Sequence, residues 1–133
     1  MIAAIHVGWK GAFKNILKKC IKFMIKKGSE NKNISAVIGP SIFRENYEVK
    51  KEFMKRFLNL NDRNRKFFYF KKTRIFFDLK EFIKSQLRSL KISNIDIINK
   101  DTFKNRTEFF SARRALKNKE DDYGRNISII MLK

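Results

Sequence analysis

The chain is poor in the residues that most often cross-link proteins or bind metals. Its 133 residues contain one histidine, one cysteine and one proline. The single cysteine, Cys20, excludes an intramolecular disulfide and suits a reducing compartment. No apolar run approaches the length of a membrane span, and the apolar residues 1–5 are too few for a signal peptide. We therefore expect a cytoplasmic protein without a membrane partner.

Acidic residues are also scarce. Thirteen Asp and Glu oppose 32 Lys and Arg, which gives a net charge of +19. A basic chain can bind nucleic acid by neutralising phosphates. Here the basic residues are spread along the whole chain, no helix-turn-helix, zinc finger or aromatic RNA-binding motif accompanies them, and Lys, Ile, Asn and Phe are all abundant, as expected of an AT-rich genome. We do not expect a nucleic-acid partner, although a basic nucleic-acid-binding module remains an alternative.

Apolar periodicity indicates alternating helices and strands. A hydrophobic content of 43% is ordinary for a globular protein. We predict helices over residues 13–24, 50–60 and 79–90, the last capped by Asp78. We predict strands over residues 2–5, 34–38, 95–98 and 127–132, and a hairpin over 67–77. The expected fold is α+β or mixed α/β, a single domain over residues 1–133 with helices packed on a central mixed sheet.

The segment around the only histidine is the most informative one. Residues 4–11 read Ala-Ile-His-Val-Gly-Trp-Lys-Gly. His6 follows the predicted strand, and two glycines flank Trp9 before a helix begins. A strand end, a glycine turn and a helix start together commonly form a ligand or metal site.

Four segments resemble one family, in the family's order. The run from His6 to Gly11 is similar to the H-A-G-W-R-G motif of the laccase-domain proteins, also called multicopper polyphenol oxidase-like proteins or purine nucleoside phosphorylases. The other segments are Ile38-Gly39-Pro40-Ser41-Ile42 with Asn46-Tyr47-Glu48-Val49, then Phe77-Asp78-Leu79 with Gln86-Leu87, then Phe109-Phe110-Ser111-Ala112-Arg113-Arg114 followed by Asp122-Tyr123-Gly124-Arg125. The chain departs from the family at Lys10, Ala112 and Asp101. The resemblance covers the C-terminal half of a family member, so we expect a truncated or split protein with an incomplete fold.

The resemblance implies a zinc site in which His6 is one ligand. The family's other ligands, a histidine and a cysteine, precede the matched segment and are absent here. One imidazole does not hold zinc tightly, because catalytic zinc has three protein ligands and a water. Copper could bind adventitiously, but one histidine excludes a multicopper oxidase. We place Cys20 in the core, on the apolar stripe of the first helix, and not at the metal.

Basic and hydroxyl side chains supply candidates for binding phosphate. Guanidinium groups bind phosphate with two parallel hydrogen bonds, and a serine adds a donor. The candidates are Ser111, Arg113, Arg114, Arg125 and Lys10. Equally, Arg113 and Arg114 could be surface residues that pair with the acidic residues at 120–122. No catalytic residue is identified, and Tyr47, Glu48 and Asp78 are expected to be structural.

The implied function is zinc-dependent phosphorolysis of adenosine, inosine or methylthioadenosine, together with deamination of adenosine. The partners would then be a purine nucleoside and phosphate, with a homo-oligomer or a complementary N-terminal chain. An inactive remnant, or half of a split enzyme, is the alternative. In either case we expect the unpaired strands to make the isolated chain poorly soluble, oligomeric or dependent on a complementary chain.

Overall fold

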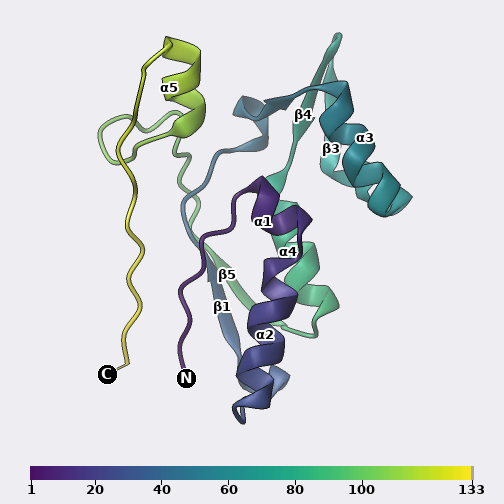
Figure 1. The fold of residues 1–133 in the computed structure, drawn as a ribbon, viewed down its shortest axis with the longest axis vertical. Coiled ribbons are helices and arrows are strands. Elements are labelled where there is room, and N and C mark those ends of the chain that lie inside the picture. The colour runs from purple at the N-terminus through teal and green to yellow at the C-terminus, as the bar shows by residue number, and fades with distance from the viewer. Residues whose placement is uncertain (133) are drawn as a thin grey trace. The chain divides into compact units, whose positions relative to one another are not determined.

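The fold is mixed α/β, which is the class that the sequence predicts, and it contains two small sheets. The computed structural model describes residues 1–132 (Figure 1). No helix in this range is both long and apolar enough to cross a bilayer. The elements, in chain order, are α1 (Trp9–Phe13), α2 (Ile16–Lys26), β1 (Ser35–Ile38), β2 (Glu48–Val49), α3 (Lys51–Leu60), β3 (Phe68–Lys71), β4 (Arg74–Phe77), α4 (Leu79–Ser89), β5 (Asn94–Ile97) and α5 (Ala112–Asn118).

The chain divides into two compact units, each of which is described by itself. The first unit comprises residues 1–39, 82–98 and those from 127 onward, and the second comprises residues 40–81 and 99–126. Helix α4 begins in the second unit and continues in the first. A single domain over residues 1–133 stays a prediction.

In the first unit, β1 and β5 form a two-stranded parallel sheet (Figure 1). Ser35 lies opposite Asn94, and the register runs to Ile38 opposite Ile97. Ile38 is buried whereas Val37 is 63% exposed. One face of this sheet therefore contributes to the core, and the other is open.

The helix predicted over residues 13–24 is in fact two helices. α1 ends at Phe13, and Asn15 adopts a left-handed conformation with φ +54°, which interrupts the helix before α2. Asparagine tolerates this conformation better than most residues. The predicted apolar stripe is present on α2, where Leu17, Ile21 and Met24 are buried.

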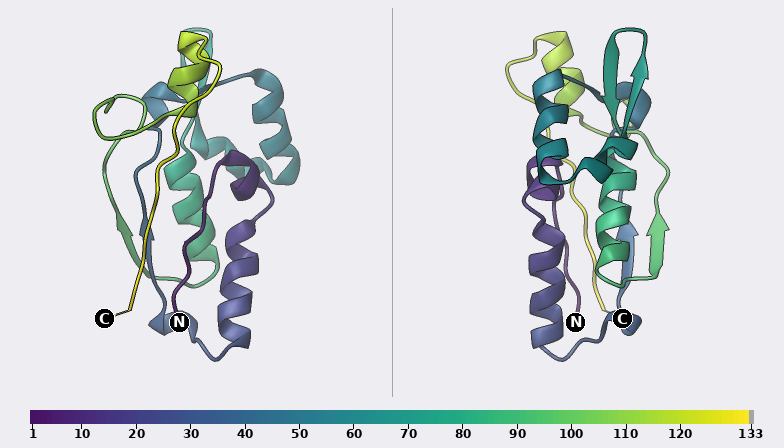
Figure 2. Two further views of the ribbon diagram at one scale, coloured as in Figure 1. Left: turned by 60° about the vertical axis from the view of Figure 1, so that its left-hand side comes forward. Right: turned by 90° about the vertical axis from the view of Figure 1, so that its right-hand side faces the viewer.

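In the second unit, β2, β4 and β3 form an antiparallel sheet in that order. The β3–β4 hairpin is the teal hairpin in the right-hand view of Figure 2. Rings from α3 pack on rings from the hairpin, and Phe57 and Phe77 are both 0% exposed with centroids 4.8 Å apart. Phe68 lies 4.8 Å from Phe77 on the hairpin itself. This aromatic cluster is the core of the second unit.

Several predicted elements are confirmed. The helices at α3 and α4, the hairpin, β1 and β5 lie where the sequence predicts them, within one or two residues. Asp78 caps α4, because its Oδ1 accepts a hydrogen bond of 3.0 Å from the backbone N–H of Glu81. β2 and α5 were not predicted.

Two predicted strands are wrong. Residues 2–5 and 127–132 are irregular chain, drawn without arrows in Figure 2. Residues 2–4 are also exposed, whereas an apolar strand next to a site would be expected to be buried. Ile127 and Ile129 are exposed as well. An apolar run becomes a strand only when a neighbouring strand hydrogen-bonds to it, and none does so within residues 1–132.

We expect Phe77→Ala to lower the free energy of unfolding by about 3–5 kcal/mol, because it leaves a cavity in the aromatic cluster. Phe70→Ala is the matched control on the same hairpin, since Phe70 is 52% exposed. Its cost should stay below about 1 kcal/mol. Urea unfolding followed by circular dichroism measures both values. Equal losses in the two variants would contradict the assignment of this core.

Candidate functional site

His6 is exposed and lies three residues before the first residue of α1, Trp9. A Cβ added at Gly8 would meet the His6 Nε2 at 3.4 Å. Gly8 has φ −74° and ψ 175°, which any residue can adopt. A small side chain at position 8 would therefore make an ordinary contact with the imidazole, and neither space nor backbone conformation requires glycine there. The ring is accessible, as a ligand-binding histidine requires.

Lys10 lies in the same unit as His6 and is exposed. Its ammonium group is 5.7 Å from the centroid of the Trp9 ring. This cation–π contact holds the lysine next to the helix start. Lys10 is free to meet an anion from solvent.

Gln86 connects α4 to the end of α1. Gln86 lies in a segment that resembles the family, but the sequence did not predict this contact. Its Nε2 donates a 2.8 Å hydrogen bond to the carbonyl of Ala12. Its Oε1 is buried, and no partner for it lies within residues 1–132. Because α1 begins three residues after His6, this bond helps to fix the segment that carries the histidine.

The described residues do not form a zinc site by themselves. Within residues 1–132, no group of three or more His, Cys, Asp and Glu side chains could hold a metal ion. Cys20 is half-buried on α2, and burial raises the pKa of its thiol. A raised pKa disfavours the thiolate that metals bind. Three protein ligands are needed, and this chain offers one imidazole.

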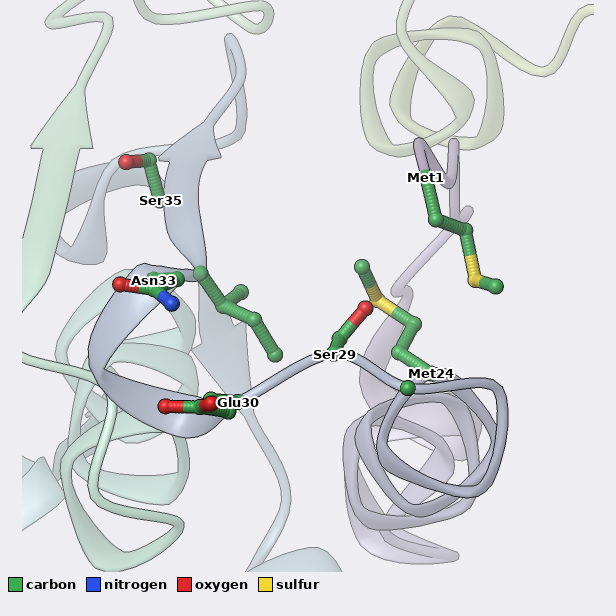
Figure 3. A pocket seen from close by; sticks show the side chains of 8 residues that line it. Met1, Met24, Ser29, Glu30, Asn33 and Ser35 are labelled. Carbon is green, nitrogen blue, oxygen red and sulfur yellow. The ribbon is translucent and has the colours of Figure 1, made fainter.

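A shallow pocket of about 290 Å³ lies elsewhere in the first unit (Figure 3). Figure 3 shows Met24 of α2 and Met1 on one side and Asn33 and Ser35 on the other. Glu30 is its one acidic side chain, and it pairs with Lys32 at 2.8 Å. None of the predicted site residues lines this pocket, so it does not mark the candidate site.

In the second unit, Arg114 holds a loop together. Its Nη1 donates to the carbonyls of Thr102 and Phe103, both at 2.9 Å, and its Nη2 donates to that of Phe109 at 2.5 Å. Ser111 is buried and caps α5, since its Oγ accepts a 3.4 Å hydrogen bond from the Arg114 N–H. Three of the five N–H donors of Arg114 are thus occupied. The geometry gives Arg114 a positioning role, and its contact with phosphate stays a prediction.

Arg113 lies on a different partner, the ring of Tyr47. The guanidinium carbon is 5.2 Å from the ring centroid. Tyr47 is buried, and burial raises the pKa of its hydroxyl, while the charge of Arg113 and a hydrogen bond from it act in the opposite direction. Among the three predicted arginines of this unit, Arg113 is the one that neither an acidic side chain nor a carbonyl holds within residues 1–132.

Arg125 is tied to its neighbours in sequence. It forms an ion pair with Asp122 at 3.4 Å and donates to the carbonyl of Tyr123. A Cβ at Gly124 would lie 2.5 Å from the exposed Phe110 ring, so a larger residue at position 124 would displace that ring. Asn126 fastens the same segment by donating to and accepting from the backbone of Phe110. The structure therefore brings Arg125 and the α5 arginines into one unit, whereas His6 and Lys10 lie in the other.

Asp101 is a buried carboxylate whose role the sequence did not reveal. Its Oδ1 accepts from the backbone N–H groups of Phe103 at 2.8 Å and Phe43 at 3.4 Å, and its Oδ2 accepts from Asn46 Nδ2 at 2.5 Å. All of these donors are neutral. Asp101 therefore connects residues 43–46 to its own loop at residues 101–103, which is a structural role.

We expect Arg114→Ala to destabilise the protein by about 2–4 kcal/mol, because three carbonyls lose a charged donor. Arg125→Ala is the matched control, since Arg125 is largely exposed and an exposed ion pair contributes little to stability. Chemical denaturation of the two variants gives the difference. A loss no larger in Arg114→Ala than in the control would contradict the role of Arg114 in holding this loop.

Tyr47 should make stability fall steeply at high pH. Its pKa in the folded protein lies above the unfolded value of about 10. Ionisation therefore favours the unfolded chain, and the contribution is present below about pH 10 and is lost as the pH rises through the folded pKa. We expect urea midpoints of the native protein to fall more steeply above about pH 10 than those of Tyr47→Phe. Parallel curves would contradict this assignment.

Comparison with known proteins gives the chain its family. The sequence profile of the multi-copper polyphenol oxidoreductase laccase family matches residues 1–133. A purine nucleoside phosphorylase of Rickettsia conorii is 36% identical over 136 residues, covering 100% of this chain and 55% of the relative. One from Rickettsia prowazekii is 36% identical over 117 residues, covering 86% and 48%. An adenosine deaminase from an unknown prokaryotic organism is 36% identical over 66 residues, covering 47% and 25%. The chain spans about half the length of the first two relatives and belongs to the multi-copper polyphenol oxidoreductase laccase family.

Proposed function

We propose that this chain is part of a purine nucleoside phosphorylase. The observation that carries the proposal is the match of the whole chain to relatives that bear this name. The reaction would join inorganic phosphate to the anomeric carbon of adenosine, inosine or methylthioadenosine as the glycosidic bond breaks and the purine leaves. The relative named as an adenosine deaminase supports a second reaction, in which water replaces the amino group of adenosine and ammonia leaves. The single cysteine agrees with a cytoplasmic location.

Arg113 is the side chain that we assign to phosphate. Its guanidinium lies on the Tyr47 ring, which restricts its position without neutralising its charge. Arg114 beside it holds the loop at 102–109 and so fixes the start of α5. A guanidinium held in this way binds phosphate through two parallel donors. Ser111, Arg125 and Lys10 are secondary candidates.

His6 is the residue that we assign to a metal, with zinc as the proposed ion and copper as an adventitious one. Zinc would supply a Lewis acid and a water of lowered pKa. Since residues 1–132 contain no three-ligand group, a tight site needs further ligands from polypeptide beyond these 133 residues. A complementary chain or a second copy would supply them. Without such ligands the geometry favours an inactive chain.

Reconstitution tests this proposal. The chain is mixed with, or fused to, the part of the R. conorii relative that it does not match. We expect phosphate-dependent release of hypoxanthine from inosine, and stoichiometric zinc, only in the reconstituted protein. His6→Ala should abolish zinc binding, and Cys20→Ser should retain it because Cys20 lies on the half-buried face of α2.

Two results would contradict the assignment. The first is zinc retained in the His6→Ala protein, measured by atomic emission after dialysis. The second is a folded, zinc-loaded reconstituted protein that releases no base from any purine nucleoside. The second result would favour an inactive remnant.

A further inference from the structure

The outer face of α2 is a row of lysines. Lys18, Lys22 and Lys26 are spaced four residues apart, and Lys19 lies three residues before Lys22. This spacing places the four lysines on one side of the helix, and all four are exposed. The other side is apolar and buried through Leu17, Ile21 and Met24. Four ammonium groups therefore extend over about 12 Å of helix, at 1.5 Å per residue. We call these four residues the lysine row.

The lysine row has no carboxylate to neutralise it. Residues 1–29 contain seven lysines and no Asp or Glu, and the first acidic residue, Glu30, pairs with Lys32. None of the four lysines forms an ion pair within residues 1–132. Like charges three or four residues apart repel each other and destabilise a helix. The row thus gains from an external anion that carries several charges.

Two observations favour single-stranded nucleic acid over a lipid surface. A helix that binds lipid inserts its apolar side, but the apolar side of α2 is already buried within the protein. The ring of Phe23 is 57% exposed beside the row, and Lys27 lies 5.9 Å from its centroid. An exposed aromatic ring next to several lysines is the combination that stacks a base while cations hold the phosphates.

We propose that α2 binds single-stranded nucleic acid, with the lysine row on successive phosphates and Phe23 against a base. This function is separate from nucleoside phosphorolysis and does not depend on it. The proposal takes up the alternative that the sequence left open, because four of the basic residues lie together and without an ion pair on one side of this helix. Binding would not be specific for sequence, since phosphates and ring faces are common to all bases.

The test compares two variants that lose the same charge. The first replaces the lysine row with glutamine (Lys18→Gln, Lys19→Gln, Lys22→Gln, Lys26→Gln). The control replaces four exposed basic residues at the start and on the outside of α3 (Lys50→Gln, Lys51→Gln, Lys55→Gln, Arg56→Gln). Fluorescence anisotropy with labelled oligothymidylate gives the affinity of each full-length protein over a series of salt concentrations. Circular dichroism checks that both variants remain folded.

We expect the row variant to bind at least about tenfold more weakly than the control. The slope of log K against log salt concentration should be smaller in magnitude by about three, because each of the four lost phosphate contacts accounts for about 0.7. Phe23→Ala should weaken binding to oligothymidylate by about tenfold and leave binding to inorganic polyphosphate unchanged. Phe70→Ala, at another exposed ring, should change neither.

Three outcomes would overturn the proposal. Equal weakening of the row variant and the control would mean that net charge alone determines binding. Tighter binding of the native protein to phosphatidylserine vesicles than to oligothymidylate would assign the row to a membrane. Equal effects of Phe23→Ala on oligothymidylate and on polyphosphate would remove the contact with a base.

Discussion

Thirteen acidic residues cannot neutralise 32 basic ones, and this shortage governs how the chain places its cations. Where no carboxylate is available, carbonyl oxygens and the faces of aromatic rings contact the cations. Arg114 donates to three carbonyls, and Arg113 lies on Tyr47. Lys80 likewise lies 4.0 Å from the centroid of the Phe43 ring. The many phenylalanines of the chain therefore serve both the core of the second unit and the positive surface around it.

The sequence pattern correctly predicted the elements that depend on interactions between residues close together in the chain. α3 and α4 follow from apolar spacing, and Asp78 caps α4 as its position indicates. The strands predicted over residues 2–5 and 127–132 are absent, because a strand depends on a neighbouring strand that its own residues do not specify. α5 was missed because its seven residues show little periodicity, and its Ser111 cap became evident only with the Arg114 N–H in place.

The candidate site shows the same division between local and distant information. The sequence singled out His6, and the structure shows it accessible beside Gly8. The sequence did not distinguish the role of Arg113 from that of Arg114, because the two residues are adjacent and of the same type. Their roles differ because their partners lie at other places in the chain, Tyr47 for one and the loop at 102–109 for the other. Gln86 and Asp101 were overlooked for the same reason, since their partners lie up to 74 and 58 residues away.

The family's descriptive name and the chemistry of this chain point in different directions. A multicopper site needs several imidazoles, and the chain has one. What the described residues supply is positive charge in two forms, held singly by a ring at Arg113 and aligned without counterions on α2. A held guanidinium suits a small anion such as phosphate, whereas a row of mobile ammonium groups suits a chain of phosphates. The two anion-binding proposals therefore need different side chains, and a variant that removes one leaves the other intact.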